Sequence, residues 1–111
     1  MSSNESPLNL DQFFNPGAVA VVGASADPTT LGHAVLHNVQ EHGFTGSIYP
    51  INPKADEILG LPAFPSLTAV PGPIDLIVVV VPPKAVAPVL EEAGQKGVKG
   101  AIIITAGFRE T

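Results

Sequence analysis

The sequence contains no cysteine and no tryptophan, and only 14% of its residues are charged. Without cysteine, the chain cannot build the disulfide scaffold that stabilises many small secreted domains. Lys and Arg together number 5 against 10 Asp and Glu, which gives a formal net charge of -5. This acidic balance argues against a nucleic-acid partner, since such partners require a basic surface.

Long apolar runs are also missing. The longest run, residues 74–81, is interrupted by Asp75 and followed by Pro82 and Pro83. It is far shorter than the ~20 apolar residues that a membrane-spanning helix needs. The N-terminal stretch MSSNESPLNLDQFF has neither the basic start nor the apolar segment of a signal peptide. We therefore expect a cytoplasmic protein without a membrane segment.

The residues that are present suit one folded domain. Hydrophobic residues make up 45% of the chain, which is too apolar for a disordered segment. A length of 111 residues is enough for one core and too short for two. We expect a flexible N-terminal segment over residues 1–9 and a domain over 10–111. Leu10, Phe13 and Phe14 have helical spacing and predict a short docking helix.

The apolar pattern predicts strands that alternate with helices. The predicted strands cover residues 18–22, 47–51, 74–81 and 101–105, and the predicted helices cover 31–42 and the stretch that begins near Val86. Gly43 and Gly97 are placed to end these helices. Residues 55–59 predict a brief helical or irregular piece, and the proline-rich residues 60–73 predict an irregular connection. Pro88 removes a backbone donor, so we expect its helix to begin late or to bend.

Strands and helices in this order are typical of an α/β fold, a Rossmann-like domain with a doubly wound parallel sheet covered on both faces. Ligands of such sheets bind outside the carboxyl ends of the strands. The candidate ligand residues are therefore those that follow each strand, namely Gly23, Ala24 and Ser25, then Asn52, Pro53 and Lys54, then Pro82, Pro83 and Lys84, and finally Ala106, Gly107 and Phe108.

The turn after the first predicted strand is suited to a phosphate. Gly23 allows a close approach of the backbone to a pyrophosphate, and Ser25 adds a hydroxyl donor. The alternative is that Gly23 only makes a tight turn between strand and helix. The full dinucleotide fingerprint is absent, because Ala24 interrupts it and the next glycine, Gly32, comes late.

The end of the second predicted strand distinguishes between nucleotides. An NAD site requires an acidic residue there, whereas this chain has Asn52 and Lys54. A lysine attracts a phosphorylated ribose, which favours NADP or coenzyme A. A solvated lysine at a helix start is an equally good interpretation. Pro82 and Pro83 form a flat apolar rim suited to an adenine, or they simply end a strand.

Neither a metal site nor a catalytic constellation is expected. His33 and His37 are four residues apart and could share a helix face, but no third ligand has matching spacing. His33 lies beside the glycine turn, where it could touch a phosphate or remain a partly solvated helix residue. No nucleophile, base and orienting group stand in a recognisable arrangement.

Five segments in order carry a family resemblance: VAVVGAS, GFTGSIYPINPK, LGLPAFPSL, PIDLIVVVVPP and GVKGAIIITAGFRE. Together they resemble the N-terminal CoA-binding domain of ADP-forming acyl-CoA synthetases, which are related to the α subunit of succinyl-CoA synthetase. The resemblance covers residues 10–111. It implies coenzyme A as the ligand. By this resemblance, the pyrophosphate lies on Gly23, Ala24 and Ser25, and the ribose with its 3′-phosphate lies along Asn52, Pro53 and Lys54. The adenine lies beside Val81, Pro82 and Pro83, and the pantetheine arm lies along Thr105, Ala106 and Gly107.

The resemblance also implies a larger enzyme. The family makes acyl-CoA from an acid, CoA and ATP through a phosphohistidine in a later domain, and the histidines of this chain do not match that residue. Thr30 and Leu31 stand where relatives often have a basic residue. We expect an incomplete, non-catalytic CoA-binding part that works with remaining domains or a β subunit. Alternatives are a protein-lysine acetyltransferase with the same domains and a stand-alone CoA- or NADP-binding protein. An open sheet edge predicts self-association into a homo-oligomer.

Overall fold

The computed structural model of the chain describes residues 17–42, 44 and 46–104. Some expectations fall outside these residues. They are the flexible segment 1–9, the docking helix built on Leu10, Phe13 and Phe14, Gly43 as a helix end, and the ligand roles of Thr105, Ala106, Gly107 and Phe108.

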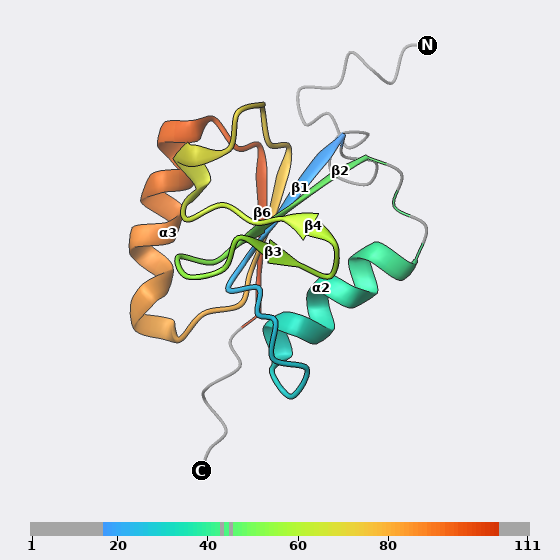
Figure 1. Ribbon diagram of the computed structural model, residues 1–111. Coiled ribbons are helices and arrows are strands. Elements are labelled where there is room, and N and C mark those ends of the chain that lie inside the picture. The colour runs from blue at the N-terminus through green and yellow to red at the C-terminus, as the bar shows by residue number, and fades with distance from the viewer. Residues whose placement is uncertain (1–16, 43, 45, 105–111) are drawn as a thin grey trace.

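A sheet of four parallel strands in the order β2-β1-β5-β6 forms the centre of the molecule (Figure 1). The strands are β1 (Ala18–Val22), β2 (Ser47–Ile51), β5 (Leu76–Val79) and β6 (Gly100–Ile103). All four predicted strands are thus confirmed, with β5 and β6 ending earlier than expected. Val19 of β1 pairs with Ile48 of β2 on one side and with Leu76 of β5 on the other. Strand order reverses between β1 and β5, which is where such sheets bind ligands.

One helix covers each face of the sheet (Figure 1). The helices are α2 (Leu31–Glu41) and α3 (Pro83–Lys96). Alternate residues of β1 serve the two faces, because Val21 packs with Leu36 of α2 while Ala20 packs in the cluster that contains Ala93 of α3. Every residue of β1 is buried, which explains its uninterrupted apolar sequence. The predicted doubly wound, Rossmann-like α/β fold is confirmed.

The prediction for residues 55–59 is wrong, because this stretch enters a short antiparallel hairpin. The hairpin consists of β3 (Glu57–Ile58) and β4 (Leu61–Pro62). Leu59 and Gly60 connect the two strands with φ of 53° and 79°, the left-handed backbone that two-residue hairpin turns require. Ile58 is buried in the cluster that contains Leu36. Packing against α2 therefore stabilises a hairpin that local propensity alone does not indicate.

The proline-rich connection over residues 60–73 contains β4 and a single 3-10 turn, η2 (Leu67–Ala69). Leu67 is fully buried in the same cluster as Ala93 of α3. Thr68 donates to the Glu92 carboxylate from both its backbone N and its Oγ1, at 3.1 Å each. These contacts hold the connection against α3.

The expectation that the second helix begins late is wrong. It begins at Pro83, since a proline at the first helical position loses no intrahelical bond and has a φ suited to the helix. The helix continues through Pro88 to Lys96. Gly97 has a φ of 82° and ends the helix in the left-handed conformation, which confirms the prediction for this glycine.

Within the described part of the chain, no helix is both long enough and apolar enough to cross a membrane.

Gly32 allows α2 to begin directly beside the end of β1. A Cβ atom on Gly32 would lie 1.9 Å from the carbonyl oxygen of Gly23, so no larger residue fits without a shift of the backbone. The last glycine of the dinucleotide fingerprint has this packing role. Gly32 therefore performs it from a position that the fingerprint spacing does not include.

We predict opposite effects for two Gly→Ala substitutions in helices. Gly32→Ala should lower the free energy of unfolding by about 1–3 kcal/mol, because the added methyl overpacks a backbone contact. Gly94→Ala should raise it by about 0.5–1 kcal/mol, because nothing lies within 4 Å of a Cβ at this helical position. Urea unfolding of both variants measures the difference, and a shift in the same direction for both would contradict the packing role of Gly32.

Candidate functional site

Three of the four predicted strand ends meet around Gly23. Its backbone N donates to the carbonyl of Ile51 at 3.3 Å, and Val80 N donates to Val22 O at 2.8 Å. Gly23 has a φ of 94°, and a Cβ there would lie 2.0 Å from Val80 O and 3.3 Å from Val81 Cγ1. The turn therefore requires glycine whatever it binds, because the backbone of β1 passes directly against the end of β5.

Asn52 joins the loop after β2 to the loop after β1. Its Nδ2 donates to the carbonyl of Ala24 at 2.8 Å, and its Oδ1 accepts from the backbone N of Lys54 at 2.7 Å. The side-chain amide thus has a structural task at a position where the sequence suggests contact with a ribose. Pro53 and Lys54 are exposed beside it, so a ligand on this edge could still reach them.

The turn after Gly23 presents backbone donors that no described residue accepts. The N–H groups of Ala24, Ser25 and Ala26 have no acceptor among the residues that the structure describes. Ser25 Oγ accepts from Asp27 N at 3.0 Å and keeps its own proton for another acceptor. Consecutive backbone donors beside the N-terminus of α2 form a group of partial positive charges suited to an anion.

A compact turn of hydrogen bonds leads from this loop into α2. Thr30 is the N-cap residue, and its Oγ1 accepts from His33 N at 3.2 Å and donates to Asp27 O at 2.8 Å. Asp27 Oδ1 accepts from Thr29 N at 2.9 Å and from Thr29 Oγ1 at 2.8 Å. These two bonds, the backbone one first, lower the pKa of the Asp27 carboxyl. Thr30 directly before an apolar helix pattern is the sequence signal that could have identified this cap.

The end of β5 supplies an apolar border. Val81 is half-buried beside Gly23 and packs against the core under α3. Pro82 is the N-cap of α3 and Pro83 its first residue, and both are exposed. Pro82 and Pro83 therefore begin a helix as well as end a strand, with their rings outside the core.

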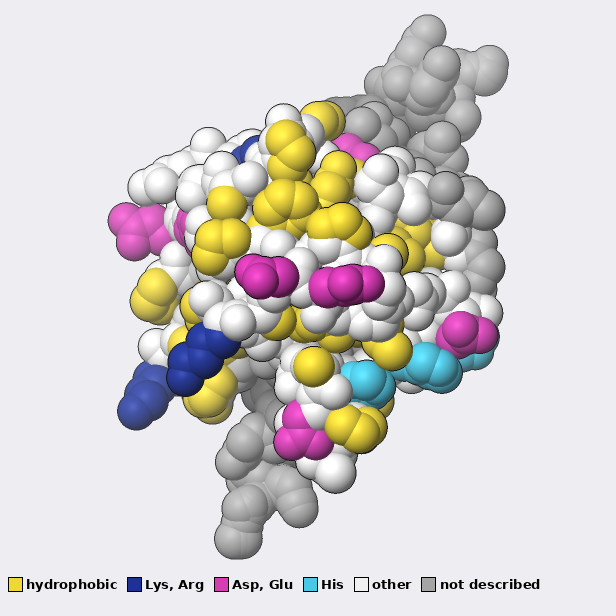
Figure 2. Space-filling model, in the orientation of Figure 1, with side chains coloured by type: hydrophobic (Ala, Val, Ile, Leu, Met, Phe, Trp, Pro, Cys, Tyr) yellow, Lys and Arg dark blue, Asp and Glu magenta, His cyan; other side chains and the backbone are white. Residues whose placement is uncertain are grey.

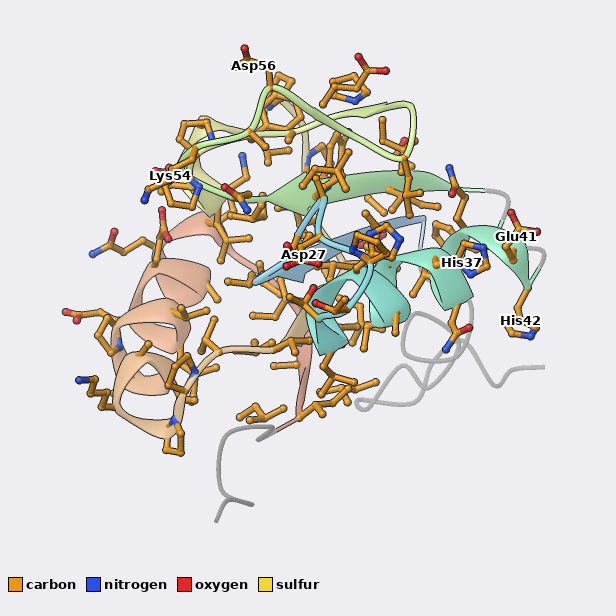
Figure 3. The ribbon with its side chains drawn as sticks, turned by 60° about the horizontal axis from the view of Figure 1, so that its bottom comes forward. Asp27, His37, Glu41, His42, Lys54 and Asp56 are labelled. Atoms are coloured by element: carbon orange, nitrogen blue, oxygen red, sulfur yellow. The ribbon has the colours of Figure 1, made fainter. Side chains whose placement is uncertain are left out.

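The three histidines of α2 and its C-cap are spread along the helix. His33 Nδ1 lies 2.9 Å from the carbonyl oxygen of Ser25, and His42 Nδ1 lies 2.9 Å from Asn38 O. Figure 3 shows His37, Glu41 and His42 toward the end of α2, away from Lys54. Among the described residues, no group of three or more His, Cys, Asp or Glu could hold a metal ion.

Basic and histidine side chains occupy different parts of the surface. On the face that Figure 2 shows, lysine side chains lie mainly at the lower left and histidines at the lower right, with acidic side chains spread over the rest of the face. The side chain of Lys54 is exposed and lies at the side of the molecule where α3 is found (Figure 3). Lys54 is two residues after Asn52, whose side chain contacts Ala24 in the loop after β1.

Comparison with known proteins supports one family. The model of a family described as "CoA binding domain" matches residues 17–111. The α subunit of acetate–CoA ligase (ADP-forming) II from Pyrococcus furiosus is 50% identical over 102 residues, which are 92% of this chain and 22% of that protein. Acetate–CoA ligase (ADP-forming) from Methanocaldococcus jannaschii is 53% identical over 95 residues, which are 86% of this chain and 13% of that protein.

A solved structure shares the fold. Acetyl-coenzyme A synthetase 1 of Ca. Korarchaeum cryptofilum, in complex with phosphate and ADP, superposes with a TM-score of 0.87 at 46% identity, covering 91% of this chain and 22% of that one. The chain thus spans about a fifth or less of the length of these relatives.

We predict that Asn52→Asp destabilises the protein by about 1–3 kcal/mol, because it replaces the donor that faces Ala24 O with a carboxylate oxygen. Thermal and urea unfolding at neutral pH measure the loss. Asp56→Asn makes the reverse exchange at an exposed position nearby and should change stability little. Equal effects of the two substitutions would exclude a role of Asn52 as the link between the loops.

We predict that the carboxyl of Asp27 titrates below its ordinary pKa and that Thr29→Ala raises this pKa, since one of its two donors is lost. Because the folded pKa is lowered, the stabilising contribution of Asp27 is complete above its ordinary pKa and is lost as the pH falls through the lowered value. NMR titration of the side-chain carboxyl carbon measures both. Thr68→Ala, far from this turn, should leave the titration unchanged.

Proposed function

This chain belongs to the CoA binding domain family, and from that premise we propose that it binds coenzyme A at the carboxyl edge of its parallel sheet. The observation that carries the proposal is the run of backbone N–H groups at Ala24, Ser25 and Ala26, which have no acceptor among the described residues. A pyrophosphate supplies the acceptors that these donors lack.

The remaining parts of coenzyme A fit the neighbouring strand ends. The exposed Lys54 side chain is suited to the 3′-phosphate of the ribose, because a lysine attracts a phosphate as a point charge. The exposed rings of Pro82 and Pro83, with the half-buried Val81 beside them, offer an apolar border for the adenine. We place the pantetheine arm along Thr105, Ala106 and Gly107, as the family resemblance implies.

Asn52 takes an indirect part in this arrangement. Its amide is engaged by Ala24 O and Lys54 N, so it joins the loop proposed for the pyrophosphate to the residue proposed for the 3′-phosphate. A substitution of Asn52 would therefore disturb the proposed contacts to the pyrophosphate and to the 3′-phosphate at once.

We further propose that the chain is the CoA-holding part of an ADP-forming acyl-CoA synthetase. The relatives whose names state an activity include acetate–CoA ligases (ADP-forming), which favours this role over a protein-lysine acetyltransferase. The complete enzyme would convert an acid, CoA and ATP into acyl-CoA, ADP and phosphate. The chain's share of that reaction is to hold CoA, and remaining domains or a β subunit would supply the catalytic groups.

The surface of β6 suits such an assembly. Ile102 and Ile103 are 42% and 43% exposed, and β6 pairs with β5 alone among the described strands. An apolar edge strand of this kind is a site for association. We propose that another domain or a second copy of the chain covers it in the cytoplasm.

Calorimetric titration tests the site. We expect wild-type protein to bind CoA more tightly than 3′-dephospho-CoA, and Lys54→Ala to weaken CoA binding about five- to tenfold while leaving 3′-dephospho-CoA unchanged. Higher salt should reduce the difference, because it screens an exposed charge. Lys99→Ala, at the opposite end of the sheet beside the start of β6, is the matched control.

Titrations with NADP and NAD complete this test. Tighter binding of NADP or NAD than of CoA would contradict the proposed ligand. An equal loss of affinity for CoA and for 3′-dephospho-CoA in Lys54→Ala would contradict the placement of the 3′-phosphate.

A further inference from the structure

His33 makes a side-chain contact with the proposed pyrophosphate loop. It is the third residue of α2 and is half-buried, and its Nδ1 lies 2.9 Å from the carbonyl oxygen of Ser25. A carbonyl oxygen can only accept, so the proton must be on Nδ1. The backbone N of His33 is held by Thr30 Oγ1, and the ring therefore extends from a capped helix start.

The contact sets the orientation of one peptide group. The described chain contains no cis peptide bond, and in a planar trans peptide the C=O and the next N–H point in opposite directions. With the Ser25 carbonyl directed at His33, the N–H of Ala26 must point away from His33. A rotation of this peptide would instead present a carbonyl oxygen where an anion is proposed to bind, and that oxygen would repel it.

Neighbouring carbonyls in the same loop are held by other side chains. Asn52 Nδ2 donates to Ala24 O, and Thr30 Oγ1 donates to Asp27 O. Neither bond uses the N–H groups of Ala24, Ser25 and Ala26, which have no acceptor among the described residues. Among the described residues, His33 alone donates to the Ser25 carbonyl.

We propose that His33 is a positioning residue of the anion site, which holds the Ser25–Ala26 peptide so that the Ala26 N–H is presented to a pyrophosphate. The inference rests on the proposed function and assigns this residue a role within it. His33 acts through the peptide, and its own ring need not touch the ligand.

The chain offers close controls. His37 lies one helical turn further along α2, is exposed, and donates no side-chain hydrogen bond to a described residue. His37→Ala therefore removes an imidazole from the same helix without touching the loop. His33→Asn keeps a side-chain N–H donor near the position of Nδ1, so it separates the loss of the donor from the loss of the ring.

The first measurement uses the ring nitrogens of the ligand-free wild-type chain. We expect the ¹⁵N signals of His33 to show the proton on Nδ1 in the neutral form. A proton on Nε2 would overturn the inference without any binding experiment.

The second measurement is calorimetric titration of the full chain with CoA, 3′-dephospho-CoA and inorganic pyrophosphate. We expect His33→Ala to weaken all three about five- to tenfold, His33→Asn to recover most of the loss, and His37→Ala to have no effect. The ratio of CoA to 3′-dephospho-CoA affinity should stay as in wild type, because the 3′-phosphate is assigned to Lys54. A partial loss of structure would also keep this ratio, because it lowers every apparent affinity by the same factor, so urea unfolding of each variant must show that its stability stays close to that of wild type.

The outcomes separate the two proposals. If wild type binds CoA and His33→Ala binds each of the three ligands as tightly as wild type does, the positioning role is overturned and the proposed function stands. If wild type binds neither CoA nor pyrophosphate, the proposed function fails, and the anion site that His33 would serve fails with it.

Discussion

The close passage of the backbone at Gly23 is the constraint on which the rest of the structure depends. On one side, a Cβ atom on Gly23 would collide with Val80 O. On the other side, a Cβ atom on Gly32 would collide with the carbonyl oxygen of Gly23. These two contacts bring the end of β1, the end of β5 and the start of α2 into one place. Because strand order reverses between β1 and β5, this point is also the edge where an α/β sheet of this topology receives a ligand.

Polar side chains organise the site from outside the core. No polar or charged residue is buried among the described residues, so the interior is held by apolar packing alone. Around the glycine turn, in contrast, Asn52, His33 and Thr30 each donate to a different loop carbonyl. These bonds fix the loop on a rigid sheet, and the N–H groups of Ala24, Ser25 and Ala26 have no acceptor among the described residues. A loop that is already ordered loses little conformational entropy when it binds a ligand.

The charge of the chain as a whole and the charge at this site have opposite signs. The formal net charge is -5, yet the proposed ligand carries several phosphate charges. Local backbone donors and the helix N-terminus provide a positive potential that does not depend on net charge. For this reason an acidic composition can argue against nucleic acid, which needs an extended basic surface, and still be compatible with one compact phosphorylated ligand.

The sequence by itself determined the four strands, the two helices, the left-handed end at Gly97 and the sheet edge on which the candidate ligand residues gather. These features follow from local apolar periodicity and turn chemistry, which short stretches of sequence contain. Tertiary structure decided the hairpin at Leu59 and Gly60, because Ile58 of the hairpin packs with Leu36 of α2. It also decided the packing role of Gly32, which depends on contact with the carbonyl of Gly23 at the end of β1. It also gave the Asn52 amide its structural task, since the spacing of Asn52 and Ala24 in the sequence does not reveal that their loops touch.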